Sequence, residues 1–262
     1  MNPATARPRI ALVVPCFNEA RRLDAAAFLA FARERDDRHL CFVDDGSTDA
    51  TSARLAEIAA AAPDRIDVVQ LPANGGKGAA VRAGLRVQLA HAPRYVGYWD
   101  ADLATPLDFV ETLAAHLDAH AELAMVIGSR VLMLGRPIAR RAARHYLGRV
   151  AATLVSLVLR APVYDSQCGA KLLRNGPALA ALLEAPFVTR WLFDVEILDR
   201  IARGEPGAAA SVLHRRVHEV PVPTWADAPG SKVHLGDWMR VPFDLARIWR
   251  DRSARESASG AA

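Results

Sequence analysis

Hydrophobic and polar positions alternate in blocks along the first half of the chain. Short apolar runs are separated by longer segments in which apolar residues recur every three or four positions. The runs predict strands at 10–14, 40–43, 66–71, 95–99 and 124–127, and the longer segments predict helices at 21–34, 51–62, 77–90 and 106–118. Strands and helices that alternate in this way favour an α/β fold with a mostly parallel sheet flanked by helices.

The pattern changes after residue 127. It predicts an arginine-rich helix at 139–159, a polar turn at 164–169, a helix at 191–203, a strand at 218–225 and a helix at 238–251. The last segment, 253–262, is rich in Ser, Ala and Gly and predicts a disordered tail. Because no linker interrupts residues 1–252, we expect one domain with two functional halves, 8–128 and 129–252.

Composition supports a folded protein without a membrane span. Hydrophobic residues make up 52% of the chain, which is enough for a sizeable core. The three cysteines, Cys16, Cys41 and Cys168, are too few for a disulfide framework and favour reduced thiols in a cytoplasmic protein. No run reaches the roughly 18 uncharged apolar residues of a membrane span, and no signal peptide is visible. Any contact with a membrane is therefore expected to be peripheral.

The net charge of +4 is distributed unevenly. Seven arginines and no acidic residue lie between positions 123 and 164. Such a block indicates an anionic partner such as a phosphate or a lipid head group, although a solvated basic face is the alternative. The predicted helix at 139–159 has a polar stripe with arginines and an apolar remainder, which is typical of a helix that lies at a membrane surface.

Carboxylates cluster where two of the predicted strands end. Asp100 and Asp102 follow the run 95–99, and Asp44 and Asp45 follow the run 40–43. Parallel sheets bind their ligands at the carboxyl ends of the strands. Asp100 and Asp102, one residue apart, can hold Mg²⁺ or Mn²⁺ beside a bound diphosphate, although a surface turn is the alternative for such a pair alone. One acid of the adjacent pair Asp44 and Asp45 could accept from a uracil N–H or a ribose hydroxyl.

Two further polar segments follow strands in the same half. The segment with Pro15, Asn18 and Glu19 follows the first run, where a base and ribose could bind. Gly75, Gly76 and Lys77 open the predicted third helix, and a glycine-rich helix N-terminus favours phosphate. The spacing is not that of a Walker loop, and the absence of Gly-x-Gly-x-x-Gly after the first run argues against a dinucleotide-binding oxidoreductase.

These segments together resemble the family 2 glycosyltransferases of the GT-A fold, and within them the dolichyl-phosphate β-glucosyltransferases. The similar segments are VVPCFNE, FVDDGSTD, NGGKGAAVRAG, DAD, IGSR, DSQCGAKLLR, RWLFDVEIL and EVPVPTWADAPGSKV. The first three and DAD are shared widely in family 2. The segments SQCG-x-K, RWLFDVE and PGSK are typical of the polyprenyl-phosphate glucosyltransferases.

The resemblance implies inverting transfer of glucose from UDP-glucose to a polyprenyl phosphate with Mg²⁺ or Mn²⁺, at the cytoplasmic face of a membrane and without a nucleic-acid partner. It implies that the nucleotide sugar contacts Pro15, Asn18, Glu19, Asp44, Asp45, Gly75, Gly76, Lys77, Asp100 and Ala101. Asp100 and Asp102 would hold the metal ion. The acceptor phosphate would bind Arg130, Arg141, Arg144 and Lys171, and the catalytic residues would be Asp102, Asp194 and Arg130.

Several alternatives stay open. The donor could be another nucleotide sugar such as GDP-mannose, and the acceptor could be soluble. Ala104 stands where related mannose synthases have Gln, and Ala170 replaces an aromatic residue common in the glucosyltransferases. A sugar-1-phosphate nucleotidyltransferase would carry a glycine-rich, arginine-containing loop after the first strand, which is absent here. A basic module that binds membranes or nucleic acid would leave the acids at the strand ends unexplained.

Overall fold

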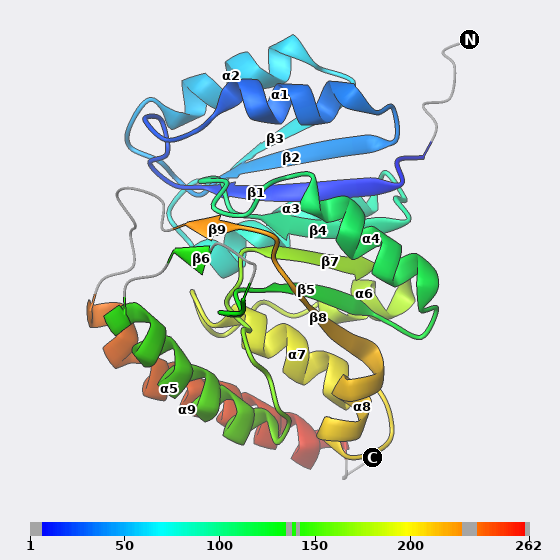
Figure 1. Ribbon diagram of the computed structural model, residues 1–262, viewed down its shortest axis with the longest axis vertical. Coiled ribbons are helices and arrows are strands. Elements are labelled where there is room, and N and C mark those ends of the chain that lie inside the picture. Colours follow the sequence, from blue (N-terminus) through cyan, green and yellow to red (C-terminus); the bar gives the residue numbers. More distant parts are fainter. Residues whose placement is uncertain (1–6, 135–137, 140–141, 227–234, 260–262) are drawn as a thin grey trace.

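The computed structural model describes residues 7–134, 138–139, 142–226 and 235–259 (Figure 1). Seven strands form one mixed sheet in the order β3-β2-β1-β4-β7-β5-β8. They are β1 (Ile10–Cys16), β2 (Arg38–Asp44), β3 (Ile66–Gln70), β4 (Tyr95–Trp99), β5 (Met125–Ser129), β7 (Ala170–Arg174) and β8 (Val217–Pro221). Two short strands, β6 (Ile138–Ala139) and β9 (Trp225–Ala226), pair in parallel as a second sheet.

Helices cover both faces of the large sheet. They are α1 (Ala25–Glu34), α2 (Thr51–Ala61), α3 (Lys77–Leu89), α4 (Phe109–Ala119), α5 (Ala142–Leu159), α6 (Pro177–Leu182), α7 (Phe193–Arg203), α8 (Ala209–Arg216) and α9 (Leu235–Ser259). In Figure 1, α4 lies on the near face of the sheet and α3 on the far face, whereas α5 and α9 lie side by side below the sheet. The predicted α/β fold with a mostly parallel sheet is confirmed.

Six strands of the large sheet run in the same direction, so their carboxyl ends lie at one edge. β1 pairs in parallel with β2 and β4, β2 with β3, and β5 with β8.

Every residue of β2 and nearly every residue of β1 is buried, as expected for strands covered on both faces. Phe28 of α1 and Phe42 of β2 meet edge to face with ring centroids 5.0 Å apart. Each such fully buried side chain stabilises the fold by about 1.5–3 kcal/mol.

Strand β7 was not predicted from the sequence. It runs antiparallel to both neighbours and separates β4 from β5. The segment is short and contains Lys171, whose side chain is only 1% exposed, so neither alternation nor a fully apolar run marks it. Because β7 belongs to the large sheet, strands from before and after residue 129 share one framework.

Several predicted boundaries differ from the structure. The first helix begins at Ala25 rather than at residue 21, because the side chain of Asp24 caps it by accepting from the Ala27 N–H at 3.0 Å. The predicted strand 218–225 is divided into β8 and β9. The segment expected as a tail from residue 253 is helical to Ser259 as part of α9.

A buried polar network joins β4, β7 and α7. The Lys171 ammonium lies 2.7 Å from Asp194 Oδ1, and the Tyr98 hydroxyl donates to the same oxygen at 2.5 Å. Lys171 also donates to the Cys168 carbonyl. Burial and the Asp194 carboxylate raise the pKa of Tyr98 well above its ordinary value, so the phenol stays a donor. These side chains are at most 4% exposed, so each depends on the others to satisfy its charge or hydrogen bond.

The network predicts strong coupling between Lys171 and Asp194. Asp194→Ala should lower the free energy of unfolding by about 3–5 kcal/mol, because it leaves the ammonium buried without its partner. Lys171→Met added to that variant should recover part of the loss, since an apolar side chain of similar length needs no counter-charge. Urea unfolding followed by circular dichroism measures the free energy of unfolding of Asp194→Ala, of Lys171→Met and of the double variant. Single-variant losses that simply add in the double variant would contradict the coupling.

Candidate active site

A cleft with a volume of about 1330 Å³ lies where β1, β2 and β4 end. Loops after these strands and the start of α3 form one wall, and residues of α5, α9 and the turn before β7 form the other. Ten residues predicted for the site line this cleft: Pro15, Asn18, Glu19, Asp45, Gly76, Lys77, Asp100, Ala101, Asp102 and Arg130. The fold therefore gathers residues from widely separated segments, as the strand-end pattern predicts.

The other predicted residues are placed differently. Asp44 and Gly75 do not line the cleft, and Lys171 and Asp194 form the buried network described above. Asp44 is fully buried, where it accepts from the Ser47 N–H at 2.9 Å and from the Ser52 hydroxyl. It thereby shapes the turn after β2. Arg141 and the side chain of Arg144 lie outside the part of the chain that the structure describes. The proposed substrate roles of all these residues stay predictions.

Asp100 and Asp102 stand at the end of β4 with opposite electrostatic environments. The Lys77 ammonium lies 2.5 Å from Asp100 Oδ1. Although burial raises the pKa of Asp100, Lys77 holds it below its ordinary value, so this carboxylate is ionised. Burial and the charge of Asp100 raise the pKa of Asp102. The charge of Asp100 opposes the ionisation of Asp102, and a divalent cation with oxygen ligands would relieve this repulsion, so the two carboxylates fit such an ion.

Gly169 sets the position of Asp100. The Gly169 carbonyl accepts from the Asp100 N–H at 2.9 Å, which fixes the two backbones against each other. A Cβ atom on Gly169 would lie 1.8 Å from Asp100 Oδ2, so any larger residue would push the carboxylate out of its place. Gly169 was part of a segment noted in the sequence but was not named as a site residue. Its role depends on the pairing of β7 with β4.

Two loops of the cleft hold non-glycine residues in the left-handed backbone region. Asn18 has φ 51° and Leu103, directly after Asp102, has φ 52°. Asparagine tolerates this region, whereas leucine there costs about 1–2 kcal/mol. The Asn18 side-chain oxygen accepts from the Thr48 N–H at 2.8 Å, and its own N–H donates to Ser47 Oγ at 2.9 Å. Asn18 thus ties the loop after β1 to the loop after β2.

The start of α3 is occupied by a carboxylate of the chain itself. Asp45 accepts from the Gly75 N–H at 2.7 Å and from the Gly76 N–H at 2.9 Å. Gly76 has φ 91°, a conformation that glycine favours. We expected these N–H groups to face a substrate phosphate, but in the structure they hold Asp45. Lys77 is the member of this segment that supplies positive charge to the cleft.

Arginines line the opposite wall. Arg130 makes a two-pronged ion pair with Asp165, with Nε 2.6 Å from Oδ2 and Nη2 2.7 Å from Oδ1. Its Cζ atom also lies 5.3 Å from the centre of the Trp225 ring. Arg149 of α5 donates to the Tyr164 carbonyl at 3.2 Å and stacks over that ring at 4.0 Å. Both guanidiniums are therefore held in defined orientations beside the cleft.

Several cationic residues of the cleft were not predicted as site residues. They are Arg22, Arg149, Arg190, Arg240, Arg247 and Arg250. The last three recur along one helix at spacings that place them on one side, a pattern the sequence does contain. Arg22 and Arg190 lie in loops. Arg190 opens the segment RWLFDVEIL noted in the sequence, but no periodic pattern marks either residue as part of the cleft. Among the described lining residues, cationic side chains outnumber carboxylates, which favours an anionic substrate.

Comparison with known proteins gives consistent results. The model of the family described as Glycosyl transferase family 2 matches residues 11–175. The dolichyl-phosphate beta-glucosyltransferase of Mus musculus is 31% identical over 273 residues, which cover 95% of this chain and 80% of that protein. A Trichomonas vaginalis protein of the same activity, ALG5A, is 31% identical over 250 residues, covering 91% of this chain and 72% of the relative.

Solved structures share the fold. Glucosyl-3-phosphoglycerate synthase from Mycobacterium tuberculosis in complex with UDP superposes with a TM-score of 0.64 at 18% identity, covering 93% of this chain and 80% of that chain. The mannosyltransferase PcManGT from Pyrobaculum calidifontis, in complex with GDP-Man and Mn²⁺, gives a TM-score of 0.60 at 20% identity, covering 96% and 65%. The GT-A type of the fold is thereby confirmed.

Substitution of Gly169 tests whether this residue positions the Asp100 carboxylate. Gly169→Ala should weaken Mn²⁺ binding in the presence of UDP by roughly 10–100-fold, the range typical when a residue that positions a metal ligand is changed. Stability should change little, because the displaced Asp100 carboxylate can turn away. Electron paramagnetic resonance titration measures the free Mn²⁺. Gly176→Ala is the matched control, since nothing lies within 4 Å of its added Cβ. Equal affinity in the two variants would contradict the positioning role.

Proposed function

Because the chain belongs to glycosyl transferase family 2, we propose that it transfers glucose from UDP-glucose to a polyprenyl phosphate of the dolichyl type, with inversion. The observation that carries the proposal is one cleft with two unlike walls. One wall holds Asp100, Asp102 and Lys77, and the other holds arginines. Relatives that match nearly the whole chain are named dolichyl-phosphate beta-glucosyltransferases, which supports this acceptor.

The donor side follows from the residues at the ends of β1 and β4. Asp100 and Asp102 would hold Mg²⁺ or Mn²⁺, which supplies positive charge to the departing diphosphate when bound. Burial lowers the pKa of Lys77, but Asp100 outweighs this and raises it, so the ammonium stays charged near the same phosphates. Asn18 and Glu19 line the neighbouring part of the cleft, where the nucleoside would bind.

The acceptor side needs little acid–base chemistry. A phosphate monoester is largely ionised at neutral pH, since its second pKa is about 6. A strong general base is therefore not required, and the main task is to orient the attacking oxygen. Asp165 and Tyr164 hold the Arg130 and Arg149 guanidiniums beside the cleft, which supports this task for both. The phosphate oxygen attacks the anomeric carbon, the bond to the diphosphate breaks, and UDP leaves from the opposite side, which inverts the configuration.

Helix α5 connects the cleft to an exposed apolar surface. Leu147, Val150, Leu154 and Leu157 recur along one side of the helix, and Val150 and Leu157 are 60% and 68% exposed. Arg149 and Val155 of the same helix line the cleft. Among the described residues, no helix combines the length and apolarity needed to cross a bilayer. We infer that this stripe, defined by its four residues, rests on a membrane surface while the cleft receives the lipid phosphate.

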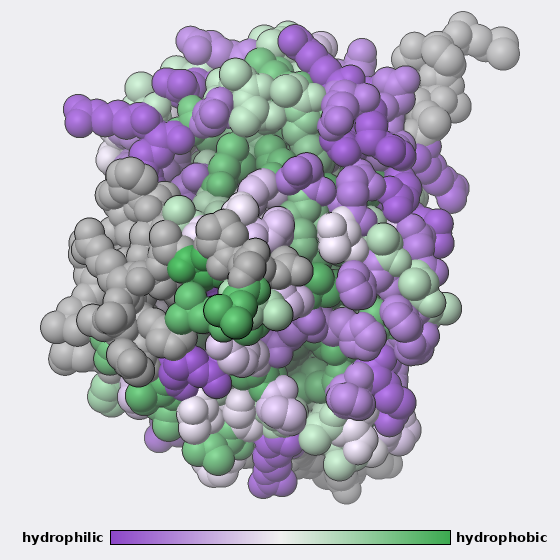
Figure 2. Space-filling model, viewed as in Figure 1, coloured by the Kyte–Doolittle hydropathy of each residue, from purple (hydrophilic) through white to green (hydrophobic). Residues whose placement is uncertain are grey.

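Other exposed apolar residues lie on α9 and in the segment before β6. Phe243 and Trp249 of α9 are exposed, and α9 packs beside α5. Leu132, Met133 and Leu134, which precede β6, are exposed as well. Figure 2 shows apolar side chains gathered around β6 and β9 on the face in view. A surface of this kind favours a lipid acceptor over a soluble one.

A donor and acceptor screen tests the proposed function. UDP- and GDP-sugars with Mn²⁺ are incubated with short polyprenyl phosphates or with soluble sugar and glycerate phosphates. We expect nucleotide release only from UDP-glucose with the polyprenyl phosphate. Asp102→Asn should reduce kcat by about 10²–10³-fold, as for loss of one group that stabilises developing charge. Asp108→Asn, an exposed carboxylate in the same segment, is the control. Transfer only to soluble acceptors, or unchanged turnover in Asp102→Asn, would contradict the proposal.

The membrane contact is tested separately. Val150→Asp and Leu157→Asp together should reduce co-sedimentation with anionic liposomes by at least about tenfold, because two apolar contacts are replaced by charges repelled by the lipid. Val68→Asp together with Val87→Asp, on β3 and α3, is the control because it adds the same two charges at partly exposed sites on elements other than α5. Donor binding should be equal in all variants. Liposome binding that survives the double substitution would refute the role of the stripe.

A further inference from the structure

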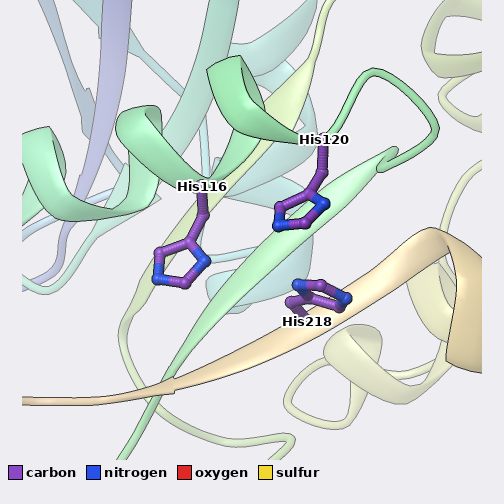
Figure 3. Close-up of side chains that lie close together, drawn as sticks. All are labelled: His116, His120 and His218. Atoms are coloured by element: carbon purple, nitrogen blue, oxygen red, sulfur yellow. The ribbon is translucent and has the colours of Figure 1, made fainter.

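Three histidines meet at the edge of the sheet, away from the cleft. His116 lies near the end of α4, His120 directly follows that helix, and His218 lies on β8 (Figure 3). One ring nitrogen from each residue lies within 4.8 Å of the other two. The ring centroids of His120 and His218 are 5.1 Å apart, and those of His116 and His218 are 6.4 Å apart. None of the three lines the cleft.

We propose that His116, His120 and His218 form a binding site for a transition-metal ion such as Zn²⁺. Imidazole nitrogens are ligands that Zn²⁺, Ni²⁺ and Cu²⁺ prefer, and three histidines with a water molecule complete a tetrahedral Zn²⁺ site. Two nitrogens about 2.0–2.1 Å from a tetrahedral ion are about 3.4 Å apart. The observed spacing is close enough that small rotations of the side chains bring the three nitrogens onto one ion.

The surroundings of the three rings support metal binding. His120 Nδ1 lies 3.3 Å from Glu122 Oε1, and a carboxylate on the second ring nitrogen is the usual way of fixing the tautomer of a metal-binding histidine. A proton shared with Glu122 leaves the lone pair of Nε2 for the metal. All three residues are only partly buried, which gives the ion a path from solvent.

The ion would act as a structural clamp. β8 is the last strand of the sheet and pairs only with β5 among the described strands. Within that pairing His218 lies opposite Val126, near the beginning of both strands, whereas the cleft lies where the parallel strands end. A metal bound by His116, His120 and His218 would fasten this edge strand to α4. Its nitrogen ligands distinguish it from Asp100 and Asp102, whose oxygens suit Mg²⁺ or Mn²⁺.

A second cluster on the molecule serves as a comparison. His39, His91 and Asp67 also lie within metal-binding distance of one another. Hydrogen bonds already explain that arrangement, since His91 Nε2 lies 2.9 Å from Asp67 and His39 Nδ1 lies 3.0 Å from Gln88. The amide of Gln88 also donates to Asp67 at 2.9 Å. This second cluster is therefore a closed hydrogen-bond network and supplies a matched control.

Isothermal titration with Zn²⁺ tests the proposal on the full chain without a polyhistidine tag. Excess Mg²⁺ is present so that oxygen-rich sites are occupied. We expect one Zn²⁺ per chain, with affinity reduced at least about tenfold in His218→Ala and in His116→Asn. His91→Ala should bind as the parent does. His116→Asn changes only a partly exposed side chain of α4, so a folded variant is available even if His218→Ala is unstable.

Thermal unfolding gives an independent readout. Zn²⁺ at about a hundredfold above its Kd should raise the Tm of the parent by roughly 5–10 °C and leave the Tm of His116→Asn unchanged. Cobalt substitution should add visible absorption bands typical of tetrahedral Co²⁺ in the parent and not in His116→Asn. Absence of Zn²⁺ binding by the parent, equal binding by His116→Asn, or loss of binding in His91→Ala instead would each overturn the proposal.

Discussion

The fixed position of the Asp100 carboxylate is the constraint on which the site depends. Three elements determine it: β4 ends directly before Asp100, α3 supplies the Lys77 ammonium, and the turn before β7 supplies Gly169. Because β7 pairs with β4, the backbone of Gly169 is hydrogen-bonded to that of Asp100, and the missing Cβ makes room for the carboxylate. The antiparallel strand β7, inside an otherwise parallel sheet, therefore helps to position the Asp100 carboxylate.

Two lysine–aspartate ion pairs lie near β4, one at the cleft and one in the buried core. Lys77 and Asp100 are partly exposed and line the cleft, whereas Lys171 and Asp194 are buried beneath it. The charge of Lys171 nevertheless reaches the site, because it contributes to the lowered pKa of Asp100. The buried pair thus links the stability of the sheet to the charge state of the carboxylate above it.

The features that the sequence predicted well are local. Apolar runs and helical periodicity depend on residues close together in the chain, so the parallel strands of the large sheet and most helices were expected within a few residues. The rule that parallel strands bind ligands at their carboxyl ends then placed Asn18, Asp45, Lys77, Asp100 and Asp102 in one cleft. No tertiary information was needed for that step.

The features that the sequence did not predict depend on contacts between distant segments. The role of Gly169 follows from strand pairing, and the bonding of Gly75 and Gly76 to Asp45 follows from how two loops meet. The histidine cluster likewise joins α4 to β8. Local pattern carries no signal for such contacts, because each depends on a partner far away in the chain.

The most direct test of the central claim is a crystal of the chain soaked in UDP and Mn²⁺, with anomalous diffraction data that locate the ion. We expect one strong anomalous peak bound by the carboxylates of Asp100 and Asp102 at the end of β4, with the diphosphate beside it. Bound UDP with no anomalous peak at these two residues, or with Mn²⁺ held elsewhere in the cleft, would contradict this assignment of the metal site.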